Sequence, residues 1–186
     1  FVHGGVLGAF LELTAMSHEV RLFAYRRHNL LYKNRTSKRA YQRWILGRLE
    51  RVCLAWQPAV VLVIKGGPVT PGLIRHVKAK IPARFVNFFP DNPLWMIPFE
   101  CIEAYDVFFT KERYAMASLQ QVGLRNLHYL PMYCVPSLHH PVTLTAEETA
   151  CFAAPLSFVG SRYDYRERFG RVLASYPLRL WGQGWS

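Results

Sequence analysis

The order of apolar and polar positions along the chain predicts helices and strands that alternate. Apolar residues recur at helical spacing from Val6 to Leu13, which predicts an amphipathic helix. In residues 20–25 aliphatic side chains are interleaved with arginine and aromatic ones, which predicts a strand. A long helix is predicted over residues 38–56 and ends before Pro58. Its apolar stripe is Tyr41, Trp44, Ile45, Leu49, Val52 and Trp56.

Four further segments are short and apolar, as strands buried on both faces are: residues 60–64, 84–89, 107–110 and 126–129. Helices are predicted between them over residues 70–80 and 111–122. Thr70 is the predicted N-cap of the first, and Gly123 the left-handed cap of the second. The pattern predicts an α/β fold, with a Rossmann-like parallel sheet and helices on both faces. Functional groups are then expected at the carboxyl ends of the strands.

The pattern changes after residue 130, where prolines interrupt a stretch with no periodicity. Thr145 and Glu148 form a capping box for a short helix. A strand at residues 156–159, a helix at 163–175 and a strand at 178–181 then begin a second unit. We therefore expect an N-terminal domain (1–130), a linker (131–155) and the start of a second domain (156–186). One strand-helix-strand unit cannot bury its own core, so we expect truncation at both ends.

Charge adds one feature to this picture. The chain has a net charge of +11 and a pI of about 9.8, and its basic residues cluster between Arg26 and Arg51. A solvated helix face is the simpler interpretation, and peripheral contact with an anionic membrane is the alternative. Nucleic-acid binding rests on charge alone and ranks last, because the aromatic residues of this helix fall on its apolar stripe.

The cysteines predict neither a zinc site nor a disulfide framework. They stand far apart and form no C-x-x-C pair. This spacing is typical of the reduced thiols of a cytoplasmic protein. No apolar run approaches the ~20 residues of a membrane span. We expect a cytoplasmic protein that can also lie at the membrane periphery. The four residues are Cys53, Cys101, Cys134 and Cys151.

Six short segments carry a resemblance to a known family. They are MSHEV (16–20), FPDNP (89–93), FTKERY (109–114), NLHYLP (126–131), PSLHHP (136–141) and SFVGS (157–161). In this order and spacing the chain resembles the CgeB-type spore-maturation family of glycosyltransferases from about residue 4 to its end. The ordered set is specific, although no single motif is. The resemblance implies a GT-B fold, in which two Rossmann-like domains face a cleft and the C-terminal one holds most of the nucleotide-sugar.

The chain also departs from the family pattern. Ser17 stands before His18 where the family usually has glycine, and Ala59 follows Pro58 where aspartate is common. In the linker, Tyr133 and Val135 stand where the family tends to have a glycine and an aspartate. These last changes leave an alternative open, a GT-B-like binding module without catalysis.

On the acceptor side, Asp91 follows a buried strand and lies between two prolines. It could act as general base toward an acceptor hydroxyl, or its side chain could close an Asx-turn. Lys65, Gly66 and Gly67 follow another strand and form either an anion cradle or a plain glycine turn. The other candidates for the cleft are Asn92, Lys111 and Tyr114, with surface and packing roles the simpler alternative for the last two.

On the donor side, Gly160, Ser161 and Arg162 follow the first strand of the second unit, and Arg166 lies on the next helix. Guanidinium groups bind phosphate oxygens bidentately. The resemblance implies that this loop contacts the donor diphosphate. The alternative is a set of solvated ion pairs between Arg166, Arg168, Asp164 and Glu167.

The expected function is transfer of a sugar from a nucleotide-sugar donor to an unknown acceptor. No Asp-x-Asp sequence occurs, so we expect a metal-independent reaction with no cofactor. Because most of the donor-binding half is absent, we expect these residues alone to be inactive.

Overall fold

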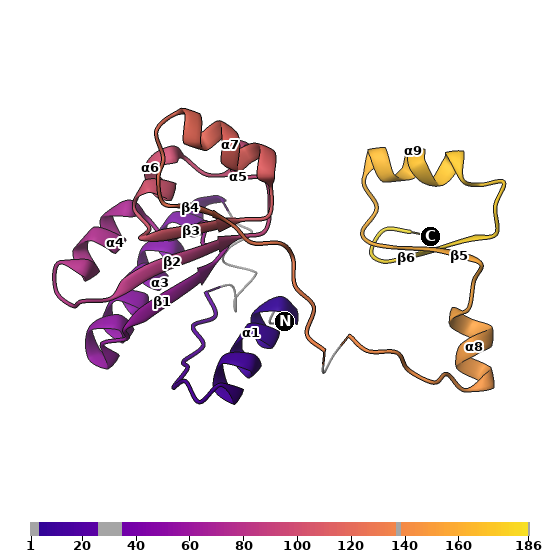
Figure 1. The fold of residues 1–186 in the computed structure, drawn as a ribbon, viewed down its shortest axis with the longest axis horizontal. Coiled ribbons are helices and arrows are strands. Elements are labelled where there is room, and N and C mark those ends of the chain that lie inside the picture. The colour runs from indigo at the N-terminus through magenta and orange to yellow at the C-terminus, as the bar shows by residue number, and fades with distance from the viewer. Residues whose placement is uncertain (1–3, 26–34, 137–138, 186) are drawn as a thin grey trace. The chain divides into compact units, whose positions relative to one another are not determined.

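The computed structural model describes residues 4–25, 35–136 and 139–185, and the chain forms two compact units (Figure 1). The first unit comprises residues 1–138 and the second residues 139–186. The division between the two falls inside the segment 131–155 that the sequence predicts as a linker.

The first unit is built on a four-stranded parallel sheet with the strand order β1-β2-β3-β4. Val60 pairs with Arg84, Val86 with Val107, and Phe108 with Leu127. The parallel sheet confirms the predicted Rossmann-like α/β fold of this unit. The strands are β1 (Val60–Ile64), β2 (Arg84–Phe89), β3 (Val107–Thr110) and β4 (Leu127–Tyr129).

Helices precede the sheet and connect its strands. Thr70 caps α4 as predicted, because its Oγ1 accepts a hydrogen bond from Leu73 N at 3.2 Å. Gly123 has φ +97°, which confirms the left-handed cap. The sequence did not predict α5 and α6, which are single turns that each begin at or after a proline. The helices are α1 (Gly4–Ala15), α3 (Arg35–Trp56), α4 (Pro71–Lys78), α5 (Pro93–Met96), α6 (Phe99–Glu103) and α7 (Arg113–Gln121).

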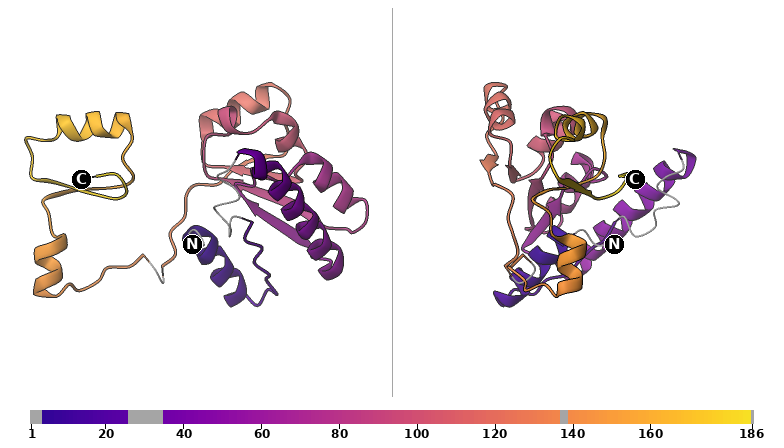
Figure 2. Two further views of the ribbon diagram at one scale, coloured as in Figure 1. Left: turned by 180° about the vertical axis from the view of Figure 1, so that it is seen from behind. Right: turned by 90° about the vertical axis from the view of Figure 1, so that its right-hand side faces the viewer.

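The core lies on one face of this sheet. Alternate residues of β2 and β3 point into it, and Phe85 and Phe108 are fully buried there. Ile74 of α4, Ile102 of α6 and Leu119 of α7 close over them, and all three have 0% exposure. Figure 2 shows the helices from behind, with α3 running alongside the sheet. Burial of large apolar side chains against a parallel sheet is the main stabilising contribution here.

Two predictions about the edge of this sheet are wrong. Residues 18–24 have no regular secondary structure, although a strand is predicted at 20–25. Tyr41 of α3 donates a hydrogen bond from its hydroxyl to Tyr25 O at 2.9 Å, so this segment packs on α3 instead. β1 is therefore the edge strand, and Val60 and Leu62 on its second face are 53% and 43% exposed. Among the described residues no helix covers these two side chains, so the predicted helical cover of both faces is not found at β1.

The linker segment covers another part of the second face. Tyr133 packs on Phe88 of β2 with 6.0 Å between ring centroids. Val135 is 2% exposed, and it packs so closely on Gly8 of α1 that a Cβ added there would lie 2.2 Å from its methyl group. The two residues that depart from the family pattern are therefore packing residues in this chain.

The second unit is a strand-helix-strand preceded by a short helix. The predicted capping box is present: Glu148 N donates to Thr145 Oγ1 at 3.2 Å, and Thr145 N donates to Glu148 Oε2 at 2.9 Å. Val159 and Phe169 are 79% and 50% exposed, so the unit buries little apolar surface. Its elements are α8 (Ala146–Phe152), β5 (Leu156–Val159), α9 (Asp164–Val172) and β6 (Leu178–Trp181), with β5 and β6 parallel.

An ion pair at the amino ends of β2 and β3 makes the first unit sensitive to acid. Asp106 accepts hydrogen bonds from Lys78 Nζ at 2.5 Å and from Phe85 N at 2.7 Å. Burial raises the pKa of Asp106, but these two hydrogen bonds outweigh burial and hold it below its usual value. A carboxyl with a lowered folded-state pKa stabilises the fold above its unfolded-state pKa, and this contribution is lost as pH falls through the folded-state pKa.

We therefore expect the stability advantage of the wild type over Asp106→Asn to be present near neutral pH and to shrink as pH falls below about 4. Urea unfolding of both proteins across that range measures the difference. A difference that stays constant with pH would contradict the role of this ion pair.

Candidate functional site

The carboxyl ends of β1 and β2 bring Lys65 and Asp91 together. The two strands end side by side, because Ile64 pairs with Phe88. Lys65 Nζ lies 2.6 Å from Asp91 Oδ2, and the two side chains are 34% and 39% exposed. The sequence placed both residues at this edge without predicting their contact. The arrangement gives a carboxylate that is held in position by a lysine and remains open to solvent.

The Asx interaction predicted as the alternative for Asp91 is made by its neighbour. Asn92 Oδ1 accepts a hydrogen bond from Leu94 N at 3.0 Å and caps α5. Asn92 is therefore a structural residue of this edge. The Asp91 carboxylate forms an ion pair with Lys65 instead. It is not needed to cap α5, because Asn92 does so.

The turn after β1 is stabilised from within. Lys65 and Gly66 have φ angles of +65° and +72°. Lys65 N donates to Phe88 O at 2.9 Å, and Gly66 N donates to Ile64 O at 2.8 Å. Since these two amides are bonded and the lysine is paired with Asp91, the geometry favours a structural turn over an anion cradle. Gly67, the third residue of the candidate, is exposed.

Two buried polar side chains lie directly beneath this turn. A Cβ added to Gly66 would lie 3.1 Å from the Tyr105 hydroxyl and 3.2 Å from Asn87 Nδ2. Asn87 is 0% exposed and Tyr105 is 3% exposed, and neither polar group has a hydrogen-bond partner among the described residues. Burial raises the pKa of Tyr105, so its hydroxyl stays protonated. This pair was not predicted from the sequence. An asparagine inside an otherwise apolar strand, Asn87, could have indicated it, because buried polar groups normally need a partner.

Lys111 and Tyr114 follow β3 but are not joined to Asp91. Lys111 forms an ion pair with Glu112, whose backbone N donates to Thr110 Oγ1 at 3.2 Å. Tyr114 of α7 is 78% exposed. No hydrogen bond or ion pair links either residue to Asp91 in the described residues, so the side chains that meet at this edge are Lys65 and Asp91.

A hollow near these elements does not contain Asp91. It has a volume of about 440 Å³ and opens on α4 and α6. Glu100 and Glu103 line it, and their negative charge is unfavourable for the phosphates of a nucleotide-sugar. Asp91 remains the candidate residue of this edge, because a positioned carboxylate at a strand's carboxyl end is the more specific feature. The full lining is Pro71, Arg75, Glu100, Glu103 and Ala104.

In the second unit, Arg162 is engaged in an ion pair. Its Nη2 lies 2.5 Å from Glu167 Oε2, and Arg171 Nη2 lies 2.5 Å from the other oxygen of the same carboxylate. Hydrogen bonds from Arg162 and then Arg171 hold the pKa of Glu167 below its usual value. Part of the positive charge that was expected to face a diphosphate is thereby neutralised by a carboxylate of α9.

Arg166 is held differently, by neutral groups. Its Nη1 donates to Ser161 O at 2.8 Å, and its Nε donates to the Tyr165 hydroxyl at 3.1 Å. The guanidinium also lies over the rings of Phe158 and Tyr163, at 5.5 Å and 5.0 Å from their centroids. No carboxylate pairs with it among residues 4–25, 35–136 and 139–185. Arg166 is therefore a positioned cation whose charge is free to meet an anion.

Gly160 leaves the room that this arrangement needs. A Cβ at residue 160 would lie 2.8 Å from Arg166 Nη1 and 3.3 Å from the Phe158 ring. The Gly160 carbonyl also accepts a hydrogen bond from Trp185 Nε1 at 2.7 Å. The structure thus brings together Gly160, Ser161 and Arg166 of the four predicted donor-side residues, while Arg162 turns to Glu167.

Neither a metal cluster nor a membrane-spanning helix is present in the parts of the chain that the structure describes. No cluster of three or more His, Cys, Asp or Glu side chains suited to a metal ion is found within the described residues. None of the described helices combines the length and apolarity needed to cross a bilayer. The four cysteines are free thiols, of which Cys53 is buried in the core.

Comparison with known proteins adds no assignment to this geometry. No protein-family model matches the chain, and no curated protein matches it.

Proposed function

We propose that the protein is a glycosyltransferase of the GT-B type that moves a sugar from a nucleotide-sugar to an unknown acceptor without a metal ion. The observation that carries the proposal is the Asp91 carboxylate at the carboxyl end of β2, oriented by Lys65 at 2.6 Å. The ordered motifs that resemble the CgeB-type family support the same reaction class.

In this proposal Asp91 is the general base of the first unit. It removes the proton from an acceptor hydroxyl while that oxygen attacks the anomeric carbon and the nucleoside diphosphate leaves. Lys65 limits the motion of the carboxylate and keeps it at the sheet edge. A carboxylate whose side chain is 39% exposed can be reached by an acceptor without a large rearrangement.

Arg166 is the proposed diphosphate-binding residue of the second unit. Its guanidinium is fixed beside the Gly160 loop and carries no carboxylate partner in the described residues. Guanidinium and phosphate oxygens form charge-assisted, often bidentate hydrogen bonds, which suit the leaving group of a nucleotide-sugar.

The direct test supplies the full-length protein with nucleotide-sugars that carry different nucleosides and sugars. Release of nucleoside diphosphate that depends on an acceptor, and that persists in the presence of a chelator, would support the proposal. Binding of a nucleotide-sugar with no turnover over a broad acceptor panel would favour the alternative, a GT-B-like binding module.

We expect Arg166→Ala to weaken nucleotide-sugar binding by about tenfold to a hundredfold, because a charge-assisted contact contributes roughly 1.5 to 3 kcal/mol. Arg168→Ala is the matched control, since Arg168 is an exposed arginine on the same helix. Arg162→Ala should have a smaller effect, because Glu167 already holds that side chain. Titration calorimetry measures all three, and equal affinities for the Arg166 and Arg168 variants would remove Arg166 from the site.

A further inference from the structure

The long helix α3 presents a basic face that the proposed reaction does not use. Its sequence contains six basic residues and a single acid, Glu50. We define the basic face by five exposed residues of this helix, which at 3.6 residues per turn spread over about half of its circumference. They are Arg39, Arg43, Trp44, Arg48 and Arg51.

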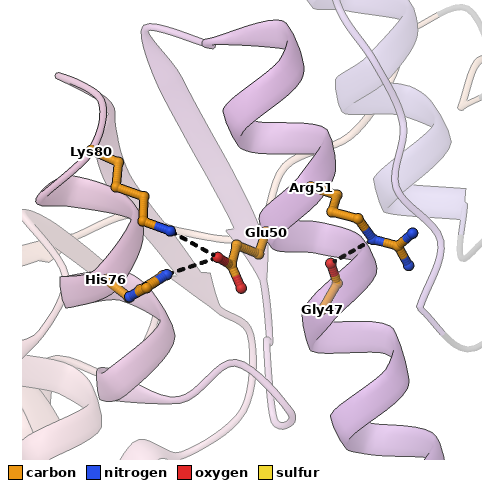
Figure 3. A network of polar contacts seen from close by, with 5 residues as sticks. All are labelled: Gly47, Glu50, Arg51, His76 and Lys80. Carbon is orange, nitrogen blue, oxygen red and sulfur yellow. Dashed lines mark hydrogen bonds and ion pairs between the residues drawn. The ribbon is translucent and has the colours of Figure 1, made fainter.

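The single acid of this helix is paired with basic groups outside α3. Glu50 Oε1 lies 2.7 Å from His76 Nε2 and 3.3 Å from Lys80 Nζ, both on the α4 side of the helix (Figure 3). Figure 3 also shows Arg51 on the opposite side of α3, where its Nε donates to Gly47 O at 3.3 Å. The positive charge of the basic face is therefore not cancelled by the carboxylate of its own helix.

An exposed tryptophan stands within this charge. Trp44 belongs to the predicted apolar stripe of α3, which would bury it, but the side chain is 47% exposed, so that prediction is wrong. Arg48 lies over its ring at 5.0 Å from the centroid. Tryptophan beside arginine is the combination that favours the interface between water and a lipid bilayer, where the ring sits among the headgroups.

A shallow hollow adjoins Trp44 and Arg48. Its volume is about 190 Å³, and Leu22, Phe23 and Ile45 are among the residues that line it. Leu22 is itself 43% exposed. Apolar side chains at the margin of an arginine-rich helix face could contact acyl chains while the guanidinium groups bind headgroup phosphates.

We propose that the basic face of α3 docks the protein on a membrane surface that carries anionic phospholipid. Charge complementarity selects the anionic headgroup, and Trp44 with Leu22 supplies the apolar contact that a phosphate alone would not need. Single-stranded nucleic acid is the weaker fit, because it prefers a basic groove with several stacking rings, and this face is the convex side of one helix with one exposed ring. Arg26, Arg27 and Lys33 lie outside the described residues, and the docking face does not depend on them.

Vesicle sedimentation with the full-length protein tests the proposal. We expect binding to vesicles of phosphatidylcholine mixed with phosphatidylserine, little binding to phosphatidylcholine alone, and weaker binding as salt is raised. The triple variant Arg43→Gln, Arg48→Gln and Arg51→Gln should lower the partition coefficient on the order of 100-fold, since each arginine near an anionic surface contributes about fivefold.

The matched control removes three exposed arginines elsewhere, by Arg84→Gln, Arg125→Gln and Arg168→Gln. It changes the net charge equally and should leave most of the binding intact.

A second pair compares Trp44→Ala with Trp95→Ala, because Trp95 of α5 is 85% exposed but lies outside the basic face. Only Trp44→Ala should weaken vesicle binding, by several-fold.

Three results would overturn the proposal. The two triple variants could lose binding alike, Trp95→Ala could weaken it more than Trp44→Ala, or a single-stranded oligonucleotide could displace the protein from the vesicles through the same arginines. Circular dichroism of each variant shows whether α3 has remained folded. If the first triple variant unfolds, the Trp44 pair and the salt dependence still decide the outcome.

Discussion

Asp91→Asn should lower the turnover of the full-length enzyme by about 10²–10⁴-fold, which is the usual contribution of a positioned general base. Asparagine keeps the size and shape of the side chain but cannot accept the acceptor's proton. The nucleotide-sugar should bind as in the wild type, because Arg166 and the Gly160 loop belong to the other unit. The change should therefore appear in kcat while the donor affinity stays unchanged.

The structural cost of this variant should be small. The variant loses the ion pair with Lys65. Both side chains of this pair are more than a third exposed, and such pairs contribute at most about 1 kcal/mol to stability. The cap of α5 is kept, since Asn92 provides it. A loss of activity with an unchanged unfolding midpoint would thus report on chemistry rather than on folding.

Asp106→Asn is the matched control for Asp91→Asn. It breaks another lysine–aspartate pair in the same unit, between Lys78 and Asp106, but at the amino ends of the strands. It should change stability at least as much as the Asp91 variant while leaving turnover unaltered. Full activity of Asp91→Asn would reject the catalytic role and leave the Lys65–Asp91 pair as a structural feature.

The sequence predicted the central elements of the fold because their signals are local. β2, β3, β5 and β6 have the predicted bounds, since short apolar runs between turn residues favour strands in an α/β pattern. Thr70, Gly123 and the Thr145 capping box each act within a few residues of the helix end they stabilise.

The failures depend on contacts between distant residues. Whether residues 20–25 form a strand depends on an available neighbour, and here the Tyr41 hydroxyl binds Tyr25 O instead. Trp44 fits the apolar periodicity of α3, but what decides its exposure is the element that packs beside it. A helical stripe shows which residues could be buried and not what covers them.

The candidate site shows the same division. The position of Asp91 at a strand's carboxyl end was predictable from chain order alone. Its partner Lys65 was not, because the pairing of β1 with β2 brings the two ends together. Likewise, the sequence could not tell which arginine pairs with Glu167. Arg162 does so, while Arg166 donates to Ser161 O, and side-chain geometry at the start of α9 decides between them.

Gly66→Ala should lower the free energy of unfolding of the first unit by about 2–5 kcal/mol. Residue 66 has φ +72°, and a left-handed conformation costs a residue with a Cβ about 1–2 kcal/mol. The added methyl group would also lie 2.4 Å from Val63 Cγ1, and crowding in a packed core typically costs a further 1–3 kcal/mol. The neighbours can yield little, because Val63 and Tyr105 are both buried.

Gly67→Ala is the control next to it in the chain. No atom lies within 4 Å of a Cβ at that residue, and its φ is outside the left-handed region. Alanine there should be neutral, or stabilising by up to about 1 kcal/mol through a smaller unfolded-state entropy. Urea unfolding of the two variants therefore separates a requirement for glycine at residue 66 from a general preference for flexibility in this turn.

The same pair of variants also tests how the turn supports Asp91. If Gly66 is needed so that Lys65 can reach the carboxylate, Gly66→Ala should lower turnover as well as stability, while Gly67→Ala changes neither by much. Equal stabilities of the two variants would show that the turn adapts to the extra methyl group and that the close packing of Gly66 on Val63, Asn87 and Tyr105 does not constrain it. A large loss of stability with unchanged turnover at low temperature would instead confine the role of Gly66 to folding.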